Sequence, residues 1–472
     1  MGRLNQNVRR FFDNSKRVRP LSRTIPSLEV RNSLRETGPS VDLNFDFAIV
    51  SDQHESLFTR PRCCPQKNEL EIEVMKILRR LLIGLGVVLA LLLLAIWIVL
   101  PPVNVPLSML GNFFPGYIDP PRVDDAIVSA RLKVPNGYQV TLFAVGIKDA
   151  RVLRVTDANH LLVASPGTGR VLILYSDASG DGRSDGYDVV LEGLNGPNGL
   201  DLYDGFLYVA EEDGIGRVPF DGRQTSGEYE VLVQGLPAGG NHWKKTLRIG
   251  PDGLMYVAVG SSCNVCEEHD ARRGTILQYH LDGSDEKLFA TGLRNSAGFD
   301  WSPEDGQLYA TDNGRDLLGD DFPPCELNRI RAGGFYGWPY ANGDRVQDPD
   351  LGSGKETVIA DSIPPVFDFP AHNAPLGIVF LRSPVHRSYM ADSAVVALHG
   401  SWNRSRKDGY KVVSLHWDAN GIIAQDFLTG FLLDDDVIGR PAEVAEDHQG
   451  NIYVSDDFAN AVYRVSRTDA AT

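Results

Sequence analysis

The chain has little cysteine, with five Cys among its 472 residues. Cys263 and Cys266 form one CxxC motif, and the sequence has no second CxxC to complete the four ligands of a structural zinc site. No βαβ pattern surrounds the pair, which disfavours a thioredoxin-like redox motif. We therefore predict a local disulfide between Cys263 and Cys266 in an oxidising compartment, and a buried free thiol at Cys325.

Positive charge is scarce over most of the chain. Residues 1–80 carry 15 Lys and Arg against 10 Asp and Glu, whereas residues 81–472 carry 31 against 52. Nucleic-acid phosphates require a basic surface, so the acidic part of the chain is a poor candidate for binding nucleic acid. With 43% hydrophobic residues and no collagen-like bias, the composition is that of a folded protein.

Charge is absent altogether from one long segment, LLIGLGVVLALLLLAIWIVL, which runs from Leu81 to Leu100. As a helix it spans the roughly 30 Å hydrocarbon core of a bilayer, and it lacks the polar face of a globular helix. Pro101 and Pro102 end the helix. The segment therefore predicts a transmembrane helix. A cleaved signal peptide is the alternative, although the apolar run is long and lies far from the N-terminus.

Basic residues are placed unequally around this segment. Lys76, Arg79 and Arg80 directly precede it, and no basic residue follows until Arg122. This asymmetry predicts a cytoplasmic N-terminus and a C-terminal domain outside the cytoplasm, anchored in the inner (cytoplasmic) membrane of a bacterium-like cell and lying in the periplasm or outside the cell.

The domain boundaries follow from these patterns. Residues 1–75 have no sustained periodicity and are predicted to be a disordered cytoplasmic segment. Residues 76–102 are the predicted anchor, residues 103–130 a linker, and residues 131–472 the folded domain.

The folded domain carries a motif that recurs six times, in which apolar residues close to a Gly precede a short β-rich run. The copies are HLLVASPGTGRVLIL from His160, GFLYVAEEDGIGRV from Gly205, GLMYVAVGSS from Gly253, GQLYATDNG from Gly306, SAVVALHGSWNRS from Ser393 and GNIYVSDDFANAVYRV from Gly450. A repeat of roughly 50–60 residues fits one four-stranded blade that must stack on its neighbours. The sequence therefore predicts an all-β fold, a six-bladed β-propeller, whose chemistry lies on the loops at one mouth of the channel.

Several of these loops resemble a known family. The stretches NHWKKTLRIGPDGLMYVAVGSSCNVCEE, GLRNSAGFDWSP, TDNGRDLLGDDFPPCELNRIRAGGFYGWPY, APLGIVF, ALHGSWNRS and GRPAEVAEDHQGNIYVSDD resemble the glucose/sorbosone dehydrogenases. These are six-bladed propellers that bind pyrroloquinoline quinone beside a calcium ion and oxidise sugars. The resemblance covers roughly residues 134–465 and is closest to the L-sorbosone dehydrogenase-like branch.

The resemblance assigns roles to three residues in particular. It makes His242 the base that takes the substrate hydroxyl proton, a role that suits a neutral imidazole. It makes Arg294 both a catalytic residue that polarises the reactive carbonyl and, with Asn295 beside it, a residue that binds the anionic quinone. The alternatives are a His that bonds a loop carbonyl and an Arg in an ion pair between blades. Asn241 stands where the glucose-oxidising branch has an acidic residue.

Calcium and the carboxylates of the quinone are assigned to further loops. By resemblance, the carbonyl oxygens of Gly314 and Arg315 face the calcium ion, although the glucose-oxidising branch has Pro at position 315. Arg404 and Arg440 are expected to engage the cofactor carboxylates, with surface or inter-blade ion pairs as the alternative. The loop DASGDGRSD, from Asp177, partly matches a calcium loop but is expected to be a hairpin turn.

The sequence thus favours a membrane-anchored quinoprotein oxidoreductase. Its substrate would be a sugar or sugar-derived aldehyde, its cofactors pyrroloquinoline quinone and Ca²⁺, and its electron acceptor a respiratory quinone or cytochrome. One alternative is a calcium-dependent lactonase-like hydrolase, which would need several side-chain oxygens converging on a metal at the channel centre. The other is a non-catalytic propeller that binds glycan or protein.

Overall fold

The computed structural model describes residues 66–99, 121–386, 390 and 393–468. The chain divides by its contacts into two units, residues 1–78 and residues 79–472. Most of residues 1–75, the segment predicted to be disordered, lies outside the described residues.

Helix α1 extends over Gln66–Val99. Its stretch Ile72–Ala95 is long and apolar enough to cross a membrane, and its large apolar side chains are exposed. The helix begins ten residues before the boundary expected for the anchor at residue 76. A salt bridge from Lys76 to Glu73, with Nζ 2.8 Å from Oε1, links the predicted anchor to this added part.

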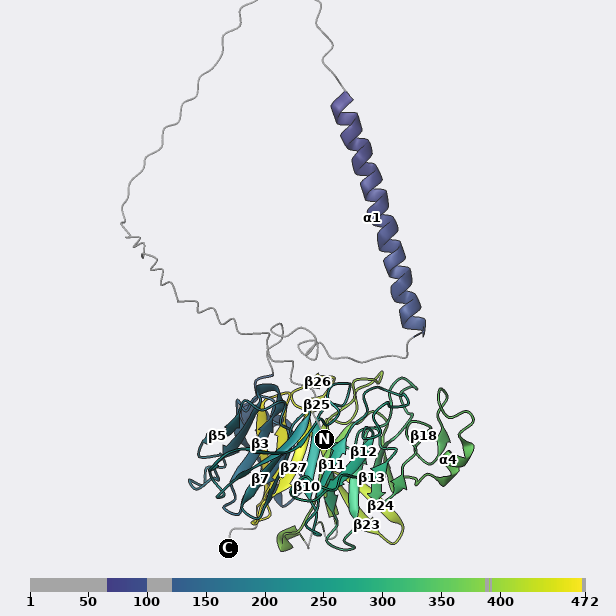
Figure 1. The fold of residues 1–472 in the computed structure, drawn as a ribbon. Coiled ribbons are helices and arrows are strands. Elements are labelled where there is room, and N and C mark those ends of the chain that lie inside the picture. The colour runs from purple at the N-terminus through teal and green to yellow at the C-terminus, as the bar shows by residue number, and fades with distance from the viewer. Residues whose placement is uncertain (1–65, 100–120, 387–389, 391–392, 469–472) are drawn as a thin grey trace, which may run out of the picture. The chain divides into compact units, whose positions relative to one another are not determined.

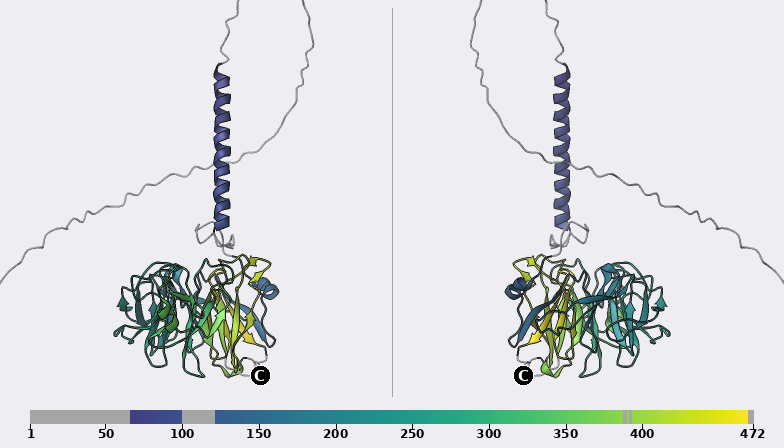
Figure 2. Two further views of the ribbon diagram at one scale, coloured as in Figure 1. Left: turned by 90° about the vertical axis from the view of Figure 1, so that its right-hand side faces the viewer. Right: turned by 90° about the vertical axis from the view of Figure 1, so that its left-hand side faces the viewer.

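The second unit contains six sheets of four strands or more, arranged as the blades of a propeller among the described residues (Figure 1). This confirms the predicted fold. Figure 2 shows the same blades in two side views. From the inner strand outward, blade 1 has β2 (Leu153–Val155), β3 (Leu161–Ser165), β4 (Arg170–Leu174) and β5 (Tyr187–Glu192), and blade 2 has β6 (Gly199–Tyr203), β7 (Phe206–Ala210), β8 (Gly214–Pro219) and β9 (Glu230–Gln234). Blade 3 has β10 (Lys245–Ile249), β11 (Met255–Val259), β12 (Thr275–Tyr279) and β13 (Lys287–Thr291), joined by β17 (Gly334–Phe335), and blade 4 has β14 (Phe299–Trp301), β15 (Leu308–Asp312), β16 (Cys325–Ile330) and β20 (Phe367–Phe369). Blade 5 has β21 (Pro375–Phe380), β22 (Ser393–Leu398), β23 (Lys411–Asp418) and β24 (Gly421–Leu428), and blade 6 has β27 (Pro441–Glu446), β28 (Ile452–Asp456), β29 (Ala461–Arg467) and β1 (Tyr138–Val145).

The propeller is closed by its two ends. Strand β1 comes first in the chain but forms the outer strand of blade 6, where Tyr138 pairs with Arg467 and Val145 with Ala461 in antiparallel register. The first and last strands of the domain thus share one sheet. The chain runs on from β1 into blade 1, so blade 6 is joined to blade 1.

Short elements decorate the blades. They are α3 (Asp125–Arg131), η2 (Pro166–Thr168), α4 (Glu356–Asp361), η3 (Pro384–His386) and two small hairpins, β18 (Ala341–Asn342) with β19 (Val346–Gln347) and β25 (Leu432–Leu433) with β26 (Asp436–Val437). Helix α3 begins in the predicted linker and ends one residue beyond it, and the Oδ1 atom of Asp124 caps the helix by accepting a hydrogen bond from the N–H of Ile127 at 2.8 Å.

The hydrophobic core lies between blades. The second strand of five blades, β3, β11, β15, β22 and β28, is buried along its whole length, because both faces of its sheet pack on a neighbouring blade. Leu162 and Ile173 of blade 1, for example, share a buried cluster with Leu207 and Val209 of blade 2. Burial on both faces explains why the sequence repeats appear as near-continuous apolar runs rather than as alternating patterns.

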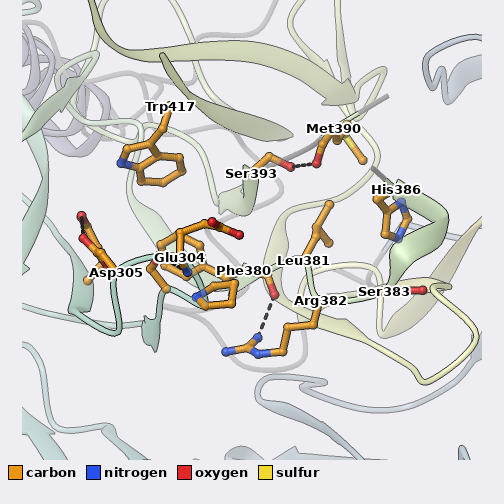
Figure 3. A pocket seen from close by; sticks show the side chains of 13 residues that line it. Glu304, Asp305, Phe380, Leu381, Arg382, Ser383, His386, Met390, Ser393 and Trp417 are labelled. Carbon is orange, nitrogen blue, oxygen red and sulfur yellow. Dashed lines mark hydrogen bonds between the residues drawn. The ribbon is translucent and has the colours of Figure 1, made fainter. Parts of the chain in front are cut away.

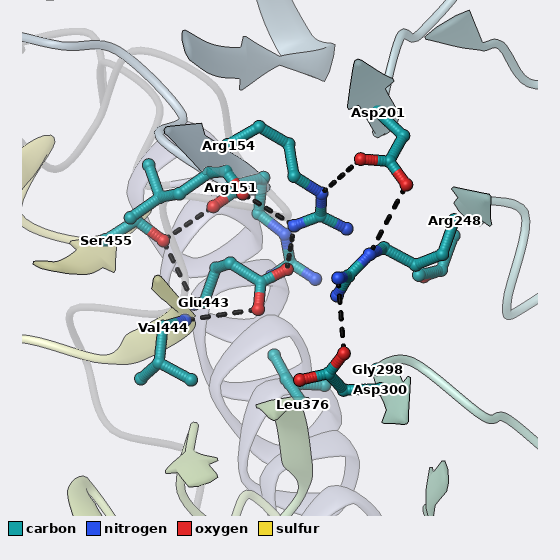
Figure 4. Close-up of polar contacts among 12 residues, drawn as sticks. Arg151, Arg154, Asp201, Arg248, Gly298, Asp300, Leu376, Glu443, Val444 and Ser455 are labelled. Atoms are coloured by element: carbon teal, nitrogen blue, oxygen red, sulfur yellow. Dashed lines mark hydrogen bonds and ion pairs between the residues drawn. The ribbon is translucent and has the colours of Figure 1, made fainter. Parts of the chain in front are cut away.

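The centre of the channel holds a ring of opposite charges, contributed by the inner strands (Figure 4). Arg154 of β2 lies 3.7 Å from Asp201 and 3.9 Å from Glu443, measured from its side-chain nitrogens to the carboxylate oxygens. Arg248 of β10 lies 3.5 Å from Asp201 and 3.2 Å from Asp300. The channel is therefore crossed by charged side chains that neutralise one another.

Each blade has two ends that carry different loops. The loops that lead into the inner strands and those between the second and third strands share one end of the propeller. The remaining loops, such as residues 302–307 between β14 and β15, share the other end. His242, Arg294, Gly314, Arg404 and Arg440 all lie on loops of the first end.

Candidate functional site

The loop that carries His242 joins β9 to β10, and its path requires a glycine. Gly240 has a φ of 82°, and a Cβ there would lie 2.6 Å from the Cα of Ser262. The backbone N–H of Asn241 donates to the carbonyl of Ser262 at 2.9 Å, and that of His242 donates to the carbonyl of Ser261 at 3.2 Å. The glycine thus lets this loop lie directly on the loop that follows β11.

The imidazole of His242 is held in one tautomer by Ser261. Its Nδ1 atom lies 2.9 Å from Oγ and 3.1 Å from the carbonyl oxygen of Ser261. The hydroxyl of Ser261 donates its own hydrogen to the carbonyl of Cys263 at 2.8 Å. Both Ser261 atoms therefore accept from Nδ1–H, which leaves Nε2 as the unprotonated nitrogen.

The surroundings of His242 keep its imidazole neutral. Burial lowers the pKa of His242 to about 3, and the nearby positive charge of Arg294 acts in the same direction. At neutral pH the ring carries one proton, on Nδ1, and Nε2 carries none. His242 therefore has the form that a general base requires.

Arg294 is the most completely bonded cation of the site. Its Nε and Nη2 donate at 2.9 Å to the backbone carbonyl and to Oδ1 of Asn264. Its Nη1 donates to the carbonyls of Asn313 and Gly314, at 3.1 and 3.0 Å, and its Nη2 also pairs with Asp316 at 3.1 Å. All five N–H groups of the buried guanidinium are thus used within the protein.

Asn295 faces the same cavity as His242. Its N–H and that of Arg294 both donate to the carboxylate of Asp312, at 2.5 and 2.9 Å. A Cβ at Gly260 would lie 2.5 Å from the Cβ of His242 and 2.9 Å from Oδ1 of Asn295. The missing side chain at Gly260 therefore allows His242 and Asn295 to approach each other.

The loop assigned to calcium is turned towards arginine side chains. The carbonyl of Gly314 accepts from Arg294, as described above. The guanidinium of Arg315 pairs with Asp348 at 2.7 Å and with Asp350 at 2.8 Å. A Cβ at Gly314 would lie 2.5 Å from the carbonyl oxygen of Pro324, so the loop is closely packed.

Arg404 is held by the β15–β16 loop of blade 4, and Arg440 by the β22–β23 loop of blade 5. Nη1 of Arg404 donates to the carbonyl of Asp320 at 2.6 Å, and Nη2 pairs with Asp321 at 3.0 Å. Arg440 is buried, and its Nε and Nη2 donate to the carbonyls of His399 and Gly400 at 3.0 and 2.7 Å. The structure therefore places both arginines outside the wall of the cavity that His242 faces.

That cavity has a volume of about 140 Å³ and lies at the mouth of the channel. Its walls bring together residues from the loops of several blades: Arg151, Asn198, Asn241, His242, Trp243, Lys244, Thr246, Asn295, Ala297 and Leu376. Of the predicted residues, only His242 and Asn295 line it. Sequence reasoning missed the two cations, Arg151 and Lys244. Lys244 stood within the quoted NHWKK stretch, whereas nothing in the KDARVLRV stretch singled out Arg151.

The structure has a disulfide between Cys263 and Cys266, with their Cα atoms 6.2 Å apart, and Cys325 is a buried free thiol. The disulfide loop contacts both parts of the site. The Cys263 carbonyl binds Ser261, and Oδ1 of Asn264 accepts from Arg294 and from the N–H of Asp316 at 2.8 Å. One short loop thus links the His242 region with the Gly314 loop.

Two other features of the sequence lie away from this site. In the loop from Asp177, that carboxylate accepts backbone N–H groups of Gly180, Asp181 and Gly182 and pairs with Arg464, as expected of a turn. A cavity of about 370 Å³ lies at the other end of the propeller, between blades 4 and 5 (Figure 3). It is lined by Arg382 and Trp417, among others, and by none of the predicted site residues.

Two relatives show similarity over most of the propeller. An uncharacterised protein of Borreliella burgdorferi is 30% identical over 360 residues, which are 72% of this chain and 91% of that protein. A pyrroloquinoline quinone-dependent pyranose dehydrogenase of Coprinopsis cinerea is 24% identical over 71% of this chain. The match spans only 55% of the fungal enzyme's length.

Solved structures share the fold. The holo form of the pyrroloquinoline quinone domain of pyranose dehydrogenase from Coprinopsis cinerea superposes with a TM-score of 0.63 at 22% identity, covering 71% of this chain and 97% of that domain. A calcium structure of a Trichoderma reesei enzyme of carbohydrate-active family AA12 gives 0.63 at 20% identity, with 72% and 97% covered. The TrAA12-like family model matches residues 132–323 and 343–468. The chain therefore belongs to the TrAA12-like family of six-bladed β-propellers.

Proposed function

We propose that this protein is a membrane-anchored quinoprotein oxidoreductase that oxidises a sugar or a sugar-derived aldehyde, of the sorbosone or aldose type. The proposal is carried by one observation: the imidazole of His242 is neutral and its Nε2 is unprotonated. His242 lines a cavity that two cations, Arg151 and Lys244, also line. The names of the relatives support the same chemistry, since one is a pyranose dehydrogenase that depends on pyrroloquinoline quinone.

The residues of the cavity fit pyrroloquinoline quinone. The molecule carries three carboxylates, and the cavity offers Arg151 and Lys244, while Asn241 and Asn295 offer amide groups. When bound, the quinone would supply an acceptor for a hydride, which carries two electrons and one proton. Arg294, in contrast, has all five N–H groups bonded to the protein, so its role here is to hold the loops around the cavity rather than to bind the quinone directly.

The chain itself supplies the proton acceptor. Nδ1–H of His242 is bonded to Ser261, so Nε2 takes the proton of the substrate hydroxyl as the carbon–hydrogen bond breaks. Because burial keeps the imidazole neutral, no competing proton occupies Nε2 at neutral pH. General-base assistance of this kind accelerates a reaction by about 10²–10⁴-fold.

The calcium site predicted from the resemblance does not fit the loop as it is arranged here. The carbonyls of Asn313 and Gly314 accept from the guanidinium of Arg294, and a divalent cation on these oxygens would lie beside that positive charge. We therefore assign no step to calcium. Quinone binding measured with and without Ca²⁺ tests the ligands that the resemblance predicts, the carbonyls of Gly314 and Arg315.

The lactonase-like alternative lacks support at the channel centre. Carboxylates do lie there, but Asp201, Asp300 and Glu443 are paired with Arg154 and Arg248 (Figure 4). Among the described residues, the only group of three or more His, Cys, Asp or Glu side chains close enough to share an ion is Cys263, Cys266 and Glu268, and the two cysteines are joined in a disulfide.

Anchoring completes the proposal. Helix α1 would hold the enzyme at the membrane, with the propeller in the periplasm or outside the cell, where a respiratory quinone or cytochrome accepts the electrons. The length and composition of Ile72–Ala95 support this part.

The test uses the full chain in detergent micelles. Quinone binding is followed by absorbance, with and without Ca²⁺, and oxidation of a panel of neutral, acidic and aldehyde sugars is followed by reduction of a dye. We expect quinone binding and turnover of at least one sugar or aldehyde. If the wild-type protein neither binds the quinone nor oxidises any member of the panel, a non-catalytic propeller is the better description.

A further inference from the structure

The cavity beside His242 is lined by cations although the chain as a whole carries a net charge of −16. Its walls include two cations, Arg151 and Lys244, and no Asp or Glu. His242 contributes no charge, since burial lowers its pKa to about 3. A small, partly enclosed space with this balance favours an anion.

Lys244 is a partly buried ammonium group that forms no direct ion pair among the described residues, although the more distant carboxylates of Asp149 and Asp457 act against burial to raise its pKa. Its Nζ lies 4.4 Å from the centre of the Trp243 ring, and that ring packs on Gly196, where a Cβ would lie 2.6 Å from Cζ3. Among the described residues, no carboxylate lies within 4.0 Å of this Nζ, and it donates no hydrogen bond to them. A buried charge of this kind is costly unless a ligand satisfies it.

The neighbouring lysine shows what a structural lysine looks like in this fold. Lys245 is 0% exposed, and its Nζ donates to the carbonyls of Pro237 and Trp243 at 2.9 and 2.6 Å. Lys245 is thus satisfied by the backbone and does not line the cavity. The contrast indicates that Lys244 is placed for something other than packing.

Arg151 is the second cation and is firmly positioned. Its Nη1 lies 2.6 Å from Oδ2 of Asp457, and its backbone carbonyl accepts from Oγ of Ser455 at 2.6 Å. The other oxygen of Asp457 lies 2.8 Å from Nε2 of His399, so this carboxylate is shared. Figure 4 shows Arg151 beside Glu443 at the centre of the propeller. Arg151 and Lys244 line the same cavity, and the charge of Arg151 lowers the pKa of Lys244, after the larger effect of burial.

We propose that Lys244 and Arg151 form a carboxylate-binding site within the cavity of His242. A carboxylate between them would give Lys244 its missing partner and relieve the repulsion between the two cations. The proposal rests on the proposed function, because the carboxylate belongs either to the bound quinone or to an acidic sugar such as a uronate. The loops before β2 and β10 supply the two side chains, so the site joins blades 1 and 3.

The test compares Lys244→Met with the wild type and with Lys148→Met, using the full chain in detergent. Lys148 is exposed on the same loop as Arg151, so this control removes the same charge and leaves the cavity unchanged. Binding of pyrroloquinoline quinone is measured by titration of absorbance, and binding of glucuronate and glucose by calorimetry. Lys244→Arg keeps the charge, and thermal unfolding shows whether each variant folds.

We expect Lys244→Met to weaken binding of one carboxylate ligand about tenfold or more, and Lys244→Arg to restore much of it. A loss confined to the quinone assigns the carboxylate to the cofactor, and a loss confined to glucuronate, with glucose unchanged, assigns it to the substrate. The site is refuted if folded Lys244→Met binds both ligands within twofold of the wild type. If the wild type binds glucuronate but no quinone, the proposed function fails while the carboxylate site stands; if it binds neither, both fail.

Discussion

The Nδ1 atom of His242 lies 2.9 Å from the hydroxyl oxygen of Ser261, and the hydrogen of that hydroxyl is given to the carbonyl of Cys263. Ser261 is completely buried. The direction of every hydrogen bond in this short chain is therefore determined, and it ends with an unprotonated Nε2 on His242. Ser261 thus determines which nitrogen of His242 can accept a proton.

Replacing Ser261 tests this relationship. In Ser261→Ala, Nδ1–H keeps the carbonyl of residue 261 as acceptor but loses the hydroxyl, so the imidazole is held less firmly. We expect a loss of roughly tenfold in kcat with little change in KM, about the effect of one hydrogen bond. Steady-state kinetics measure it, and equal losses in kcat and in quinone affinity would indicate a general disturbance of the site instead.

Removal of the base should have a larger effect. We expect His242→Ala to lose about 10²–10⁴-fold in turnover while it still binds the quinone, because the cations of the cavity remain. Dye reduction reports turnover and absorbance reports binding. Full turnover in this variant would mean that another group takes the substrate proton.

The pH dependence of stability should also reveal the lowered pKa of His242. Its pKa is about 3 in the folded protein, against an ordinary value of 6.5, so below pH 6.5 the unfolded chain binds a proton that the folded protein does not. The stability from this group is present above pH 6.5 and is lost as the pH falls. We expect the Tm of the wild type to drop more between pH 7 and pH 4 than that of His242→Gln. His448→Gln, at an exposed position, serves as the control.

The orientation of the chain is open to a direct measurement. Lys76, Arg79 and Arg80 precede the apolar run, and this distribution predicts a cytoplasmic N-terminus. A reporter that is active only outside the cytoplasm, fused after Thr472, should therefore be active. A second reporter that works only in the cytoplasm should be silent at the same position, and the opposite pair of results would reverse the predicted orientation.

The fold could be predicted from the sequence because the second strand of most blades is buried on both faces. Runs such as LLVAS at Leu161–Ser165 and MYVAV at Met255–Val259 are mostly apolar, and six of them at regular spacing indicate six blades. The closure of the propeller by β1 could not be predicted from the sequence, because the pairing of Tyr138 with Arg467 joins two segments more than 300 residues apart. Long-range pairing of this kind leaves no local signal.

The site was harder to predict for the same reason. His242 and Asn295 were found from their motifs and do line the cavity. Arg404 and Arg440, predicted to engage the cofactor carboxylates, donate to backbone carbonyls and do not line this cavity, so their role stays a prediction. Arg151 was missed, because which arginine reaches the channel mouth depends on how loops from different blades meet. Residue type indicated the need for cations, whereas only the structure shows which cations line the cavity.

The disulfide loop provides the final prediction. Asn264, between Cys263 and Cys266, binds the guanidinium of Arg294 and the N–H of Asp316. Closing so short a loop stabilises the folded state by on the order of 2 kcal/mol in the chain-entropy model. Intact-mass analysis should show the two cysteines oxidised, and free alkylation of both without reductant would contradict the bond.

Loss of the disulfide should affect the site as well as stability. In Cys263→Ser with Cys266→Ser, the loop that carries Asn264 is free to move, so Arg294 and the Gly314 loop lose part of their support. We expect a lower Tm together with weaker quinone binding. Asn264→Ala separates the two effects, because it keeps the disulfide and removes the Oδ1 contacts. Weaker quinone binding in Asn264→Ala, with the disulfide intact by mass, would show that the loop acts through Arg294; unchanged binding would limit the disulfide to a role in stability.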